Sequence, residues 1–165
     1  MDCAYAEIES LFSEKDLRFE MRCESPGADY RCHGDRKLLL QLFTNLFSNA
    51  IKFSPQNTSI IATVAHMTQE QRAGILIGVR DHGVGIPESE LGRVFDRFVQ
   101  SSLTKTGAGG TGLGLAICKT IVDQHAGRLW AETTDEGALF HVWLPAAAGV
   151  LSDQAVPPSR ADNAA

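Results

Sequence analysis

Five glycines crowd the segment from Gly107 to Gly114, directly before an apolar helical pattern. Glycine lets backbone N–H groups come close to an anion, and the helix that follows adds the positive end of its dipole. The segment therefore indicates a phosphate site. A glycine-rich loop before a helix can also be a flexible connection, so this interpretation depends on two further segments. These are a second glycine turn, Asp81–Pro87, and a helix with two asparagines, Asn45–Lys52.

The composition is that of one ordinary globular domain. The chain has 165 residues, of which 44% are hydrophobic and 21% charged, enough to build a single core. No apolar run approaches the ~20 residues of a membrane span, and the first residues lack the order of a signal peptide, so we expect a cytoplasmic chain. The four cysteines form no C-x-x-C pair and are expected to be reduced, mostly packed thiols: Cys3, Cys23, Cys32 and Cys118.

The formal net charge is −5, and no basic block is present. This excludes nucleic acid as an expected partner, but a nucleotide needs only a few local cations. Lys52, Arg93, Arg97 and Lys105 lie in or beside the motif segments. They are either phosphate ligands or solvated surface charges.

The pattern along the chain predicts an α+β layer, with one mixed sheet and helices on one of its faces. Asp35 is a natural N-cap for a long helix that Ser54-Pro55 ends. A long connection of low regularity, 83–110, contains one short helical piece. The predicted helices are Ala4–Lys15, Asp35–Phe53, Glu88–Phe98 and Gly112–His125, and the predicted strands are Leu17–Cys23, Tyr30–His33, Ser59–Met67, Ala73–Arg80, Arg128–Thr133 and Ala138–Leu144.

Asn49 lies on the edge of the broad apolar face of the long helix, one turn after Asn45. A buried amide must find partners. Either neighbouring backbone satisfies Asn49, or its carbonyl oxygen binds a hard cation that carries a triphosphate, with Lys52 beside it as a point charge.

Asp81 ends an apolar strand and precedes Gly83 and Gly85. Its carboxylate either forms the turn by accepting from its own backbone, or accepts a hydrogen bond from a ligand in an apolar pocket. An adenine amino group is such a donor. The two other motifs favour the second interpretation.

Taken together, Asn45–Lys52, Asp81–Pro87, Val94–Phe98 and Gly110–Gly114 resemble the N, G1, F and G2 boxes of the catalytic, ATP-binding domain of bacterial sensor histidine kinases. The order and spacing are those of the family, and the resemblance covers roughly 17–145. It implies the Bergerat (GHKL) fold: a two-layer α/β sandwich with about five strands, three helices on one face, and an ATP lid between the F and G2 boxes.

The resemblance also implies roles for single residues. Asn49 would hold Mg²⁺ with support from Asn45, Lys52 and Arg97 would meet phosphates, and Asp81 would accept from adenine. Phe53 stands where the family often has tyrosine, and His82 replaces a common asparagine. The nucleotide-binding residues predicted in this way are Asn45, Asn49, Lys52, Phe53, Asp81, Gly83, Gly85, Ile86, Phe98, Lys105, Gly110, Thr111, Gly112, Leu113 and Gly114; the catalytic set is Asn45, Lys52 and Arg97, and the metal ligand is Asn49.

None of the five histidines has the setting of a phospho-accepting histidine. We therefore expect a monomeric fragment: residues 1–16 as the end of a linker helix from a missing dimerisation domain, 17–145 as the ATP-binding kinase domain, and 146–165 as a disordered tail. The parent protein could be membrane-anchored. The expected partners are the histidine-bearing dimerisation domain and, indirectly, a response regulator.

Three functions remain open at this point. The first is phosphotransfer from ATP to a histidine on another domain. The second is that of relatives with the same fold, which are ATP-driven clamps or serine kinases of the anti-sigma type; they place a glutamate where this chain has Asn45, which has no basic lone pair to take a proton. The third is a module without kinase activity, either one that binds nucleotide for regulation or a degenerate one that binds partners and no nucleotide.

Overall fold

The computed structural model describes residues 12–103 and 111–147. They form one five-stranded sheet in the order β1-β2-β3-β5-β4. β1 pairs with β2 in parallel and every other pair is antiparallel, so the sheet is mixed, as predicted. The elements are β1 (Arg18–Cys23), α2 (Arg36–Phe53), β2 (Ser59–Gln69), β3 (Arg72–Arg80), α3 (Glu88–Leu91), α4 (Gly114–Gln124), β4 (Arg128–Thr134) and β5 (Gly137–Pro145).

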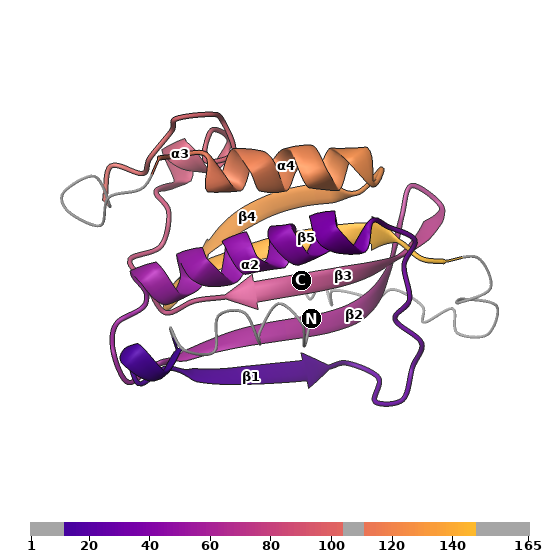
Figure 1. Cartoon of the computed structure of the whole chain (residues 1–165), viewed down its shortest axis with the longest axis horizontal. Helices are drawn as coiled ribbons and strands as arrows, with labels where there is room; N and C mark the ends of the chain where they lie inside the picture. Colours follow the sequence, from indigo (N-terminus) through magenta and orange to yellow (C-terminus); the bar gives the residue numbers. More distant parts are fainter. Residues whose placement is uncertain (1–11, 104–110, 148–165) are drawn as a thin grey trace, which may run out of the picture.

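The helices α2 and α4 lie side by side over one face of the sheet (Figure 1). The core fills the space between the two layers. Its largest fully buried side chains come from both helices and from three strands: Phe47, Leu42, Leu46, Ile60, Leu144, Val79, Val122, Val142 and Cys118. This is the α+β sandwich that the sequence predicts. Among the described residues, no helix is long and apolar enough to span a bilayer.

The long helix begins as predicted, because the Asp35 side chain accepts hydrogen bonds from the backbone of Lys37 and Leu38. His125, which follows α4, contacts the same place. Its Nε2 accepts from the Asp35 N–H at 3.0 Å, which leaves Nδ1 to donate to the Ile121 carbonyl at 2.7 Å. The start of α2 and the end of α4 are thereby joined.

Three predicted elements differ from the structure. The helix expected over 88–98 ends at Leu91, because Gly92 follows and the chain then turns so that Phe95 packs edge-on against Phe140, with 6.4 Å between ring centroids. The strand expected over 30–33 is a single bridge between Cys32 and Ala146. The loop expected over 68–72 is a turn of two residues, Glu70 and Gln71, both with positive φ, so both strands are longer than predicted.

Other boundaries shift by one or two residues. The helix expected from Gly112 starts at Gly114, since Gly112 has φ +67°, which a right-handed helix does not allow. Residues 12–14 are helical, but most of the helix expected before them lies outside the described residues, as do 104–110 of the expected lid and all but two residues of the expected tail. Cys118 is buried, whereas Cys23 is exposed, so the packing expected of the cysteines does not hold for Cys23.

We expect Gly74→Ala to destabilise the domain. A Cβ at Gly74 would lie 2.2 Å from Cε2 of Trp143, and this buried indole is held in place because its Nε1 donates to the Met67 carbonyl at 2.8 Å. Overpacking of this kind costs about 1–3 kcal/mol, which lowers the thermal midpoint by roughly 3–10 °C. Gly92→Ala is the matched control, because a Cβ there meets nothing within 4 Å. Equal midpoints for the two variants in a thermal melt would contradict the prediction.

Candidate nucleotide-binding site

One cavity of about 270 Å³ opens between the last turns of α2, the segment after β3 and the start of α4. It brings together nine of the predicted nucleotide-binding residues: Asn49, Lys52, Phe53, Asp81, Gly85, Ile86, Thr111, Gly112 and Gly114. These nine residues come from three separate parts of the chain, so their convergence on one cavity is a property of the fold.

Asp81 is the most constrained polar group of the cavity. It is 3% exposed, and its Oδ1 accepts from the backbone of Gly83 at 2.9 Å and of Ala138 at 3.1 Å. Burial raises the pKa of this carboxyl, and the two backbone N–H donors act in the opposite direction. With Oδ1 fully engaged, Oδ2 is the oxygen left to accept a hydrogen bond from a molecule in the cavity.

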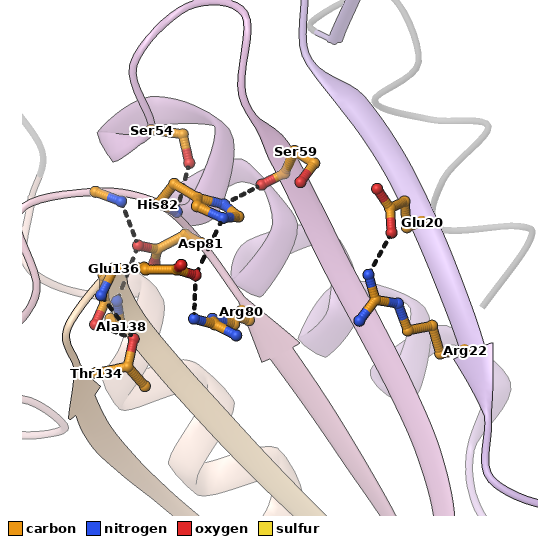
Figure 2. A network of polar contacts seen from close by, with 12 residues as sticks. Glu20, Arg22, Ser54, Ser59, Arg80, Asp81, His82, Thr134, Glu136 and Ala138 are labelled. Atoms are coloured by element: carbon orange, nitrogen blue, oxygen red, sulfur yellow. Dashed lines mark hydrogen bonds and ion pairs between the residues drawn. The ribbon is translucent and has the colours of Figure 1, made fainter.

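A polar network holds the turn that carries Asp81 (Figure 2). The His82 N–H donates to Ser54 Oγ at 3.3 Å, and His82 Nδ1 contacts the Ser59 carbonyl at 2.7 Å. His82 Nε2 lies 3.6 Å from Glu136, which pairs with Arg80. The His82 backbone therefore connects this turn to the residue after α2, and its side chain, which replaces the family's asparagine, connects it to the start of β2 and to the β4–β5 hairpin.

The N-terminus of α4 forms the opposite side of the cavity. Among the described residues no side chain caps it, so its first backbone N–H groups are available to an anion, and the helix dipole adds to their attraction. A Cβ at Gly114 would lie 3.9 Å from Asn49 Nδ2, so the Asn49 amide stands next to this helix end. Asn49 is only half-buried, less than its place on the helix predicted.

Lys52 and Phe53 occupy the last turn of α2. The Lys52 ammonium lies 5.0 Å from the centre of the Phe53 ring, within the range of a cation–π interaction. One cation and one aromatic face therefore stand together on the α2 side of the cavity.

Asn45 does not line the cavity. Its amide faces Cys118 of α4, where burial raises the pKa of the thiol to about 12 and the amide partly offsets that rise. Asn45 Nδ2 is buried and has no hydrogen-bond partner within the described residues.

Four further predicted residues lie outside the lining: Gly83, Arg97, Phe98 and Leu113. Phe98 is 73% exposed with φ +64°, and Arg97 is exposed. Lys105 and Gly110 lie outside the described residues. The cavity is also lined by residues outside the predicted set of nucleotide-binding residues: Val84, Val94, Val99, Gln100, Ser101, Leu115, Ala138 and Phe140.

Ala138 and Phe140 were missed because they belong to β5, far from the motifs in the sequence. Their place follows from the pairing of β3 with β5, in which Val79 faces Phe140. The alternation of side chains along β5 could have predicted which of them face the core. It could not have predicted that β3 is the neighbouring strand.

The side chains that line the cavity could bind a hard cation only together with a ligand that supplies most of the coordinating oxygen atoms. Within the described ranges no group of three or more His, Cys, Asp or Glu side chains could hold a metal ion. Mg²⁺ typically takes one or two protein ligands and the rest from phosphates and water. Asn49 beside an uncapped helix end fits that arrangement.

Comparison with known proteins defines the class. Residues 34–148 match the family described as histidine kinase-, DNA gyrase B- and HSP90-like ATPase. The chain belongs to this ATPase family.

Similar proteins within the family are sensor kinases. The adaptive-response sensory kinase SasA of Prochlorococcus marinus subsp. pastoris is 35% identical over 152 residues, which cover 92% of this chain and 40% of that protein. The sensor histidine kinase WalK of Bacillus subtilis is 35% identical over 138 residues, which cover 78% of this chain and 22% of that protein. The chain thus spans less than half the length of these relatives.

Solved structures show the same fold. The catalytic domain of histidine kinase ThkA aligns with a TM-score of 0.69 and 28% identity, over 86% of this chain and 88% of that one. The mycobacterial sensor histidine kinase MprB aligns with a TM-score of 0.68 and 27% identity, over 87% and 92%. Both alignments cover nearly the whole of the solved chain.

The raised pKa of Asp81 makes the stability of the nucleotide-free domain depend on pH. The protonated carboxyl contributes stability that is fully present below the ordinary value of 3.8 and is lost as the pH rises through the raised pKa. Asp81→Asn has no charge to bury. We therefore expect the variant to gain free energy of unfolding relative to the wild type as the pH rises from 3.5 to 7.

Denaturant titrations of both proteins across this range measure the difference. Asp96→Asn is the control, because Asp96 is exposed and its removal should leave the difference nearly constant. A shift in favour of the wild type at neutral pH would show that the Asp81 carboxylate is stabilised rather than penalised by its surroundings.

Proposed function

We propose that this chain is the catalytic domain of a two-component sensor histidine kinase, which transfers the γ-phosphate of ATP to a histidine on a separate dimerisation domain. The observation that carries the proposal is the buried Asp81, whose Oδ2 remains available at the cavity. The start of α4, whose first N–H groups can bind an anion, lines the same cavity. One ligand with a hydrogen-bond donor at one end and phosphates at the other would therefore satisfy both Asp81 Oδ2 and these N–H groups.

In this proposal adenine enters beside Asp81 and Phe53. The Asp81 Oδ2 accepts a hydrogen bond from the adenine amino group, and the Phe53 ring packs against the base. The phosphates extend toward Lys52 and the first N–H groups of α4, with Thr111 and Gly112 beside them. We also assign phosphate contacts to Arg97 and, outside the described residues, to Lys105 and Gly110.

Asn49 would hold the Mg²⁺, which neutralises phosphate charge when bound. Asn45, one turn earlier, would support this position through its buried amide.

The residues that line the cavity bear on which group accepts the γ-phosphoryl group. Among the described residues that line it, Asp81 is the only carboxylate, and its place is at the adenine end. Activation of water or a serine hydroxyl needs a base near the γ-phosphate, and Asn45 cannot serve. A neutral imidazole is already nucleophilic, which supports histidine over water or serine as the acceptor.

A dimerisation domain would supply that histidine, and a response regulator would receive the phosphoryl group from it. ATP as the donor supports a cytoplasmic location for the domain. A GHKL module that binds nucleotide without kinase activity is the alternative, and phosphorylation of a histidine domain added in trans separates the two.

We expect Asp81→Asn to change nucleotide selectivity. The amide oxygen would take over the two backbone N–H donors, which leaves an NH₂ group facing the adenine amino group, donor against donor. Loss of a hydrogen bond to a charged group costs about 1.5–3 kcal/mol, so ATP affinity should fall roughly 10- to 100-fold. GTP, whose base presents a carbonyl there, should lose less.

Calorimetric titrations of wild type and variant with ATP and GTP measure this selectivity. Asp96→Asn again serves as the control and should bind both as the wild type does. Equal losses for ATP and GTP would mean that Asp81 only shapes the turn, and unmeasurable ATP binding by the wild type would refute the proposed function.

We expect Asn49→Ala to abolish the enhancement of ATP binding by Mg²⁺ while the fold stays intact. The reason is the loss of the Asn49 side-chain amide, which lies beside the end of α4. The measurement is ATP affinity with Mg²⁺ and with EDTA. Gln41→Ala removes an exposed amide from the same helix and should retain the enhancement. If magnesium still tightened ATP binding to Asn49→Ala, the metal assignment would be wrong.

A further inference from the structure

Lys15 precedes β1 and lies outside the residues 34–148 that match the ATPase family. Its side chain nevertheless reaches the end of α2. The Nζ atom donates to the carbonyl oxygens of Ile51 at 2.8 Å, Lys52 at 2.8 Å and Ser54 at 3.1 Å. An ammonium group has three donors, so three acceptors satisfy it completely.

These contacts satisfy backbone carbonyls at the end of α2. The last four carbonyls of a helix have no partner within the helix, and a positive charge at that end is favourable for the helix dipole. In α2 the Ala50 carbonyl accepts from the Ser54 N–H. Lys15 satisfies the next two, at Ile51 and Lys52, and also Ser54, the residue that follows the helix.

The segment that carries Lys15 is itself fixed. Phe12 is 3% exposed and packs edge-on against Phe19, with 5.8 Å between ring centroids. Phe19 packs in the same way against Phe47 of α2, at 5.4 Å. Figure 1 shows this segment, in indigo before β1, next to the end of α2 that leads into β2. Lys15 is therefore held at a definite distance from the helix.

The backbone that Lys15 holds belongs to the wall of the cavity. Lys52 and Phe53 line the cavity, and Ser54 is 3% exposed and accepts from the His82 N–H in the turn that carries Asp81. One ammonium group thus fixes the turn that presents a cation and an aromatic ring to the ligand.

We infer that Lys15 is a positioning residue of the nucleotide site, contributed by the segment before β1. It holds the last turn of α2 so that Lys52 and Phe53 face the ligand before the ligand binds. The identity of the ligand as ATP rests on the proposed function, whereas the ordering of the α2 end rests on the contacts of Lys15 alone. A displacement of the segment before β1 would weaken nucleotide binding through the same contacts.

The test uses Lys15→Met, which keeps the aliphatic stem and removes the donors, and Lys15→Arg, which keeps charge and donors. Lys37→Met is the matched control, because it removes an exposed lysine from the opposite end of α2. Val64→Ala, a core change away from the nucleotide cavity, controls for a general loss of stability. Each variant is titrated with ATP and Mg²⁺, and amide hydrogen exchange is followed over 50–54 without nucleotide.

We expect Lys15→Met to bind ATP roughly 5- to 30-fold more weakly, because two side chains must then be ordered on binding. Its amides over 52–54 should exchange faster while the rest of the fold stays protected. Lys15→Arg should recover most of the affinity, and Lys37→Met and Val64→Ala should bind as the wild type does.

Unchanged affinity in Lys15→Met, or an equal loss in Val64→Ala at similar stability, would overturn the inference and leave the proposed function intact. If the wild type bound no ATP, the proposed function would fail. Amide hydrogen exchange alone would then test whether Lys15 orders the end of α2. Faster exchange confined to the end of α2 in Lys15→Met would support the positioning role, and unchanged exchange would refute it.

Discussion

A buried carboxylate at the end of β3 is the constraint on which the cavity depends. Asp81 can be buried only because two backbone N–H groups donate to it, and one of them, from Ala138, is delivered by the pairing of β3 with β5. The neighbouring Gly137 must lack a side chain, since a Cβ there would lie 2.3 Å from the Asp81 carbonyl oxygen. Burial raises the pKa of the carboxyl. Both backbone N–H groups donate to Oδ1, which leaves Oδ2 as an acceptor that a ligand can use.

The second constraint is the helix that carries the rest of the site. α2 is held at both ends: His125 contacts Asp35 at its start, and Lys15 satisfies carbonyls at its end. Between these points the helix buries its apolar face against the sheet, so the polar edge has little freedom. Asn49, Lys52 and Phe53 therefore stand at fixed positions in the cavity that the start of α4 also lines, and an anion that reaches this end meets preorganised groups.

Short sequence patterns predicted the features of the fold that depend on residues close together in the sequence. Asp35 marked the start of α2, and the glycine motifs marked the segments that converge on the cavity. What failed depends on contacts far apart in the sequence: the helix expected over 88–98 is shortened by the packing of Phe95 on Phe140, and the cavity residues of β5 follow from sheet register. Lys15 gave no signal, because an isolated lysine looks like surface charge until its acceptors in α2 are placed beside it.

Calorimetry of the unmodified chain with ATP and Mg²⁺, combined with an assay of phosphate release, tests the central claim most directly. The account predicts one ATP bound per chain and hydrolysis close to the uncatalysed rate. In the proposed function the base lies at Asp81, and the described residues that line the rest of the cavity include no carboxylate that could activate water. A robust steady-state ATPase from the pure chain, or no ATP binding at all, would contradict it.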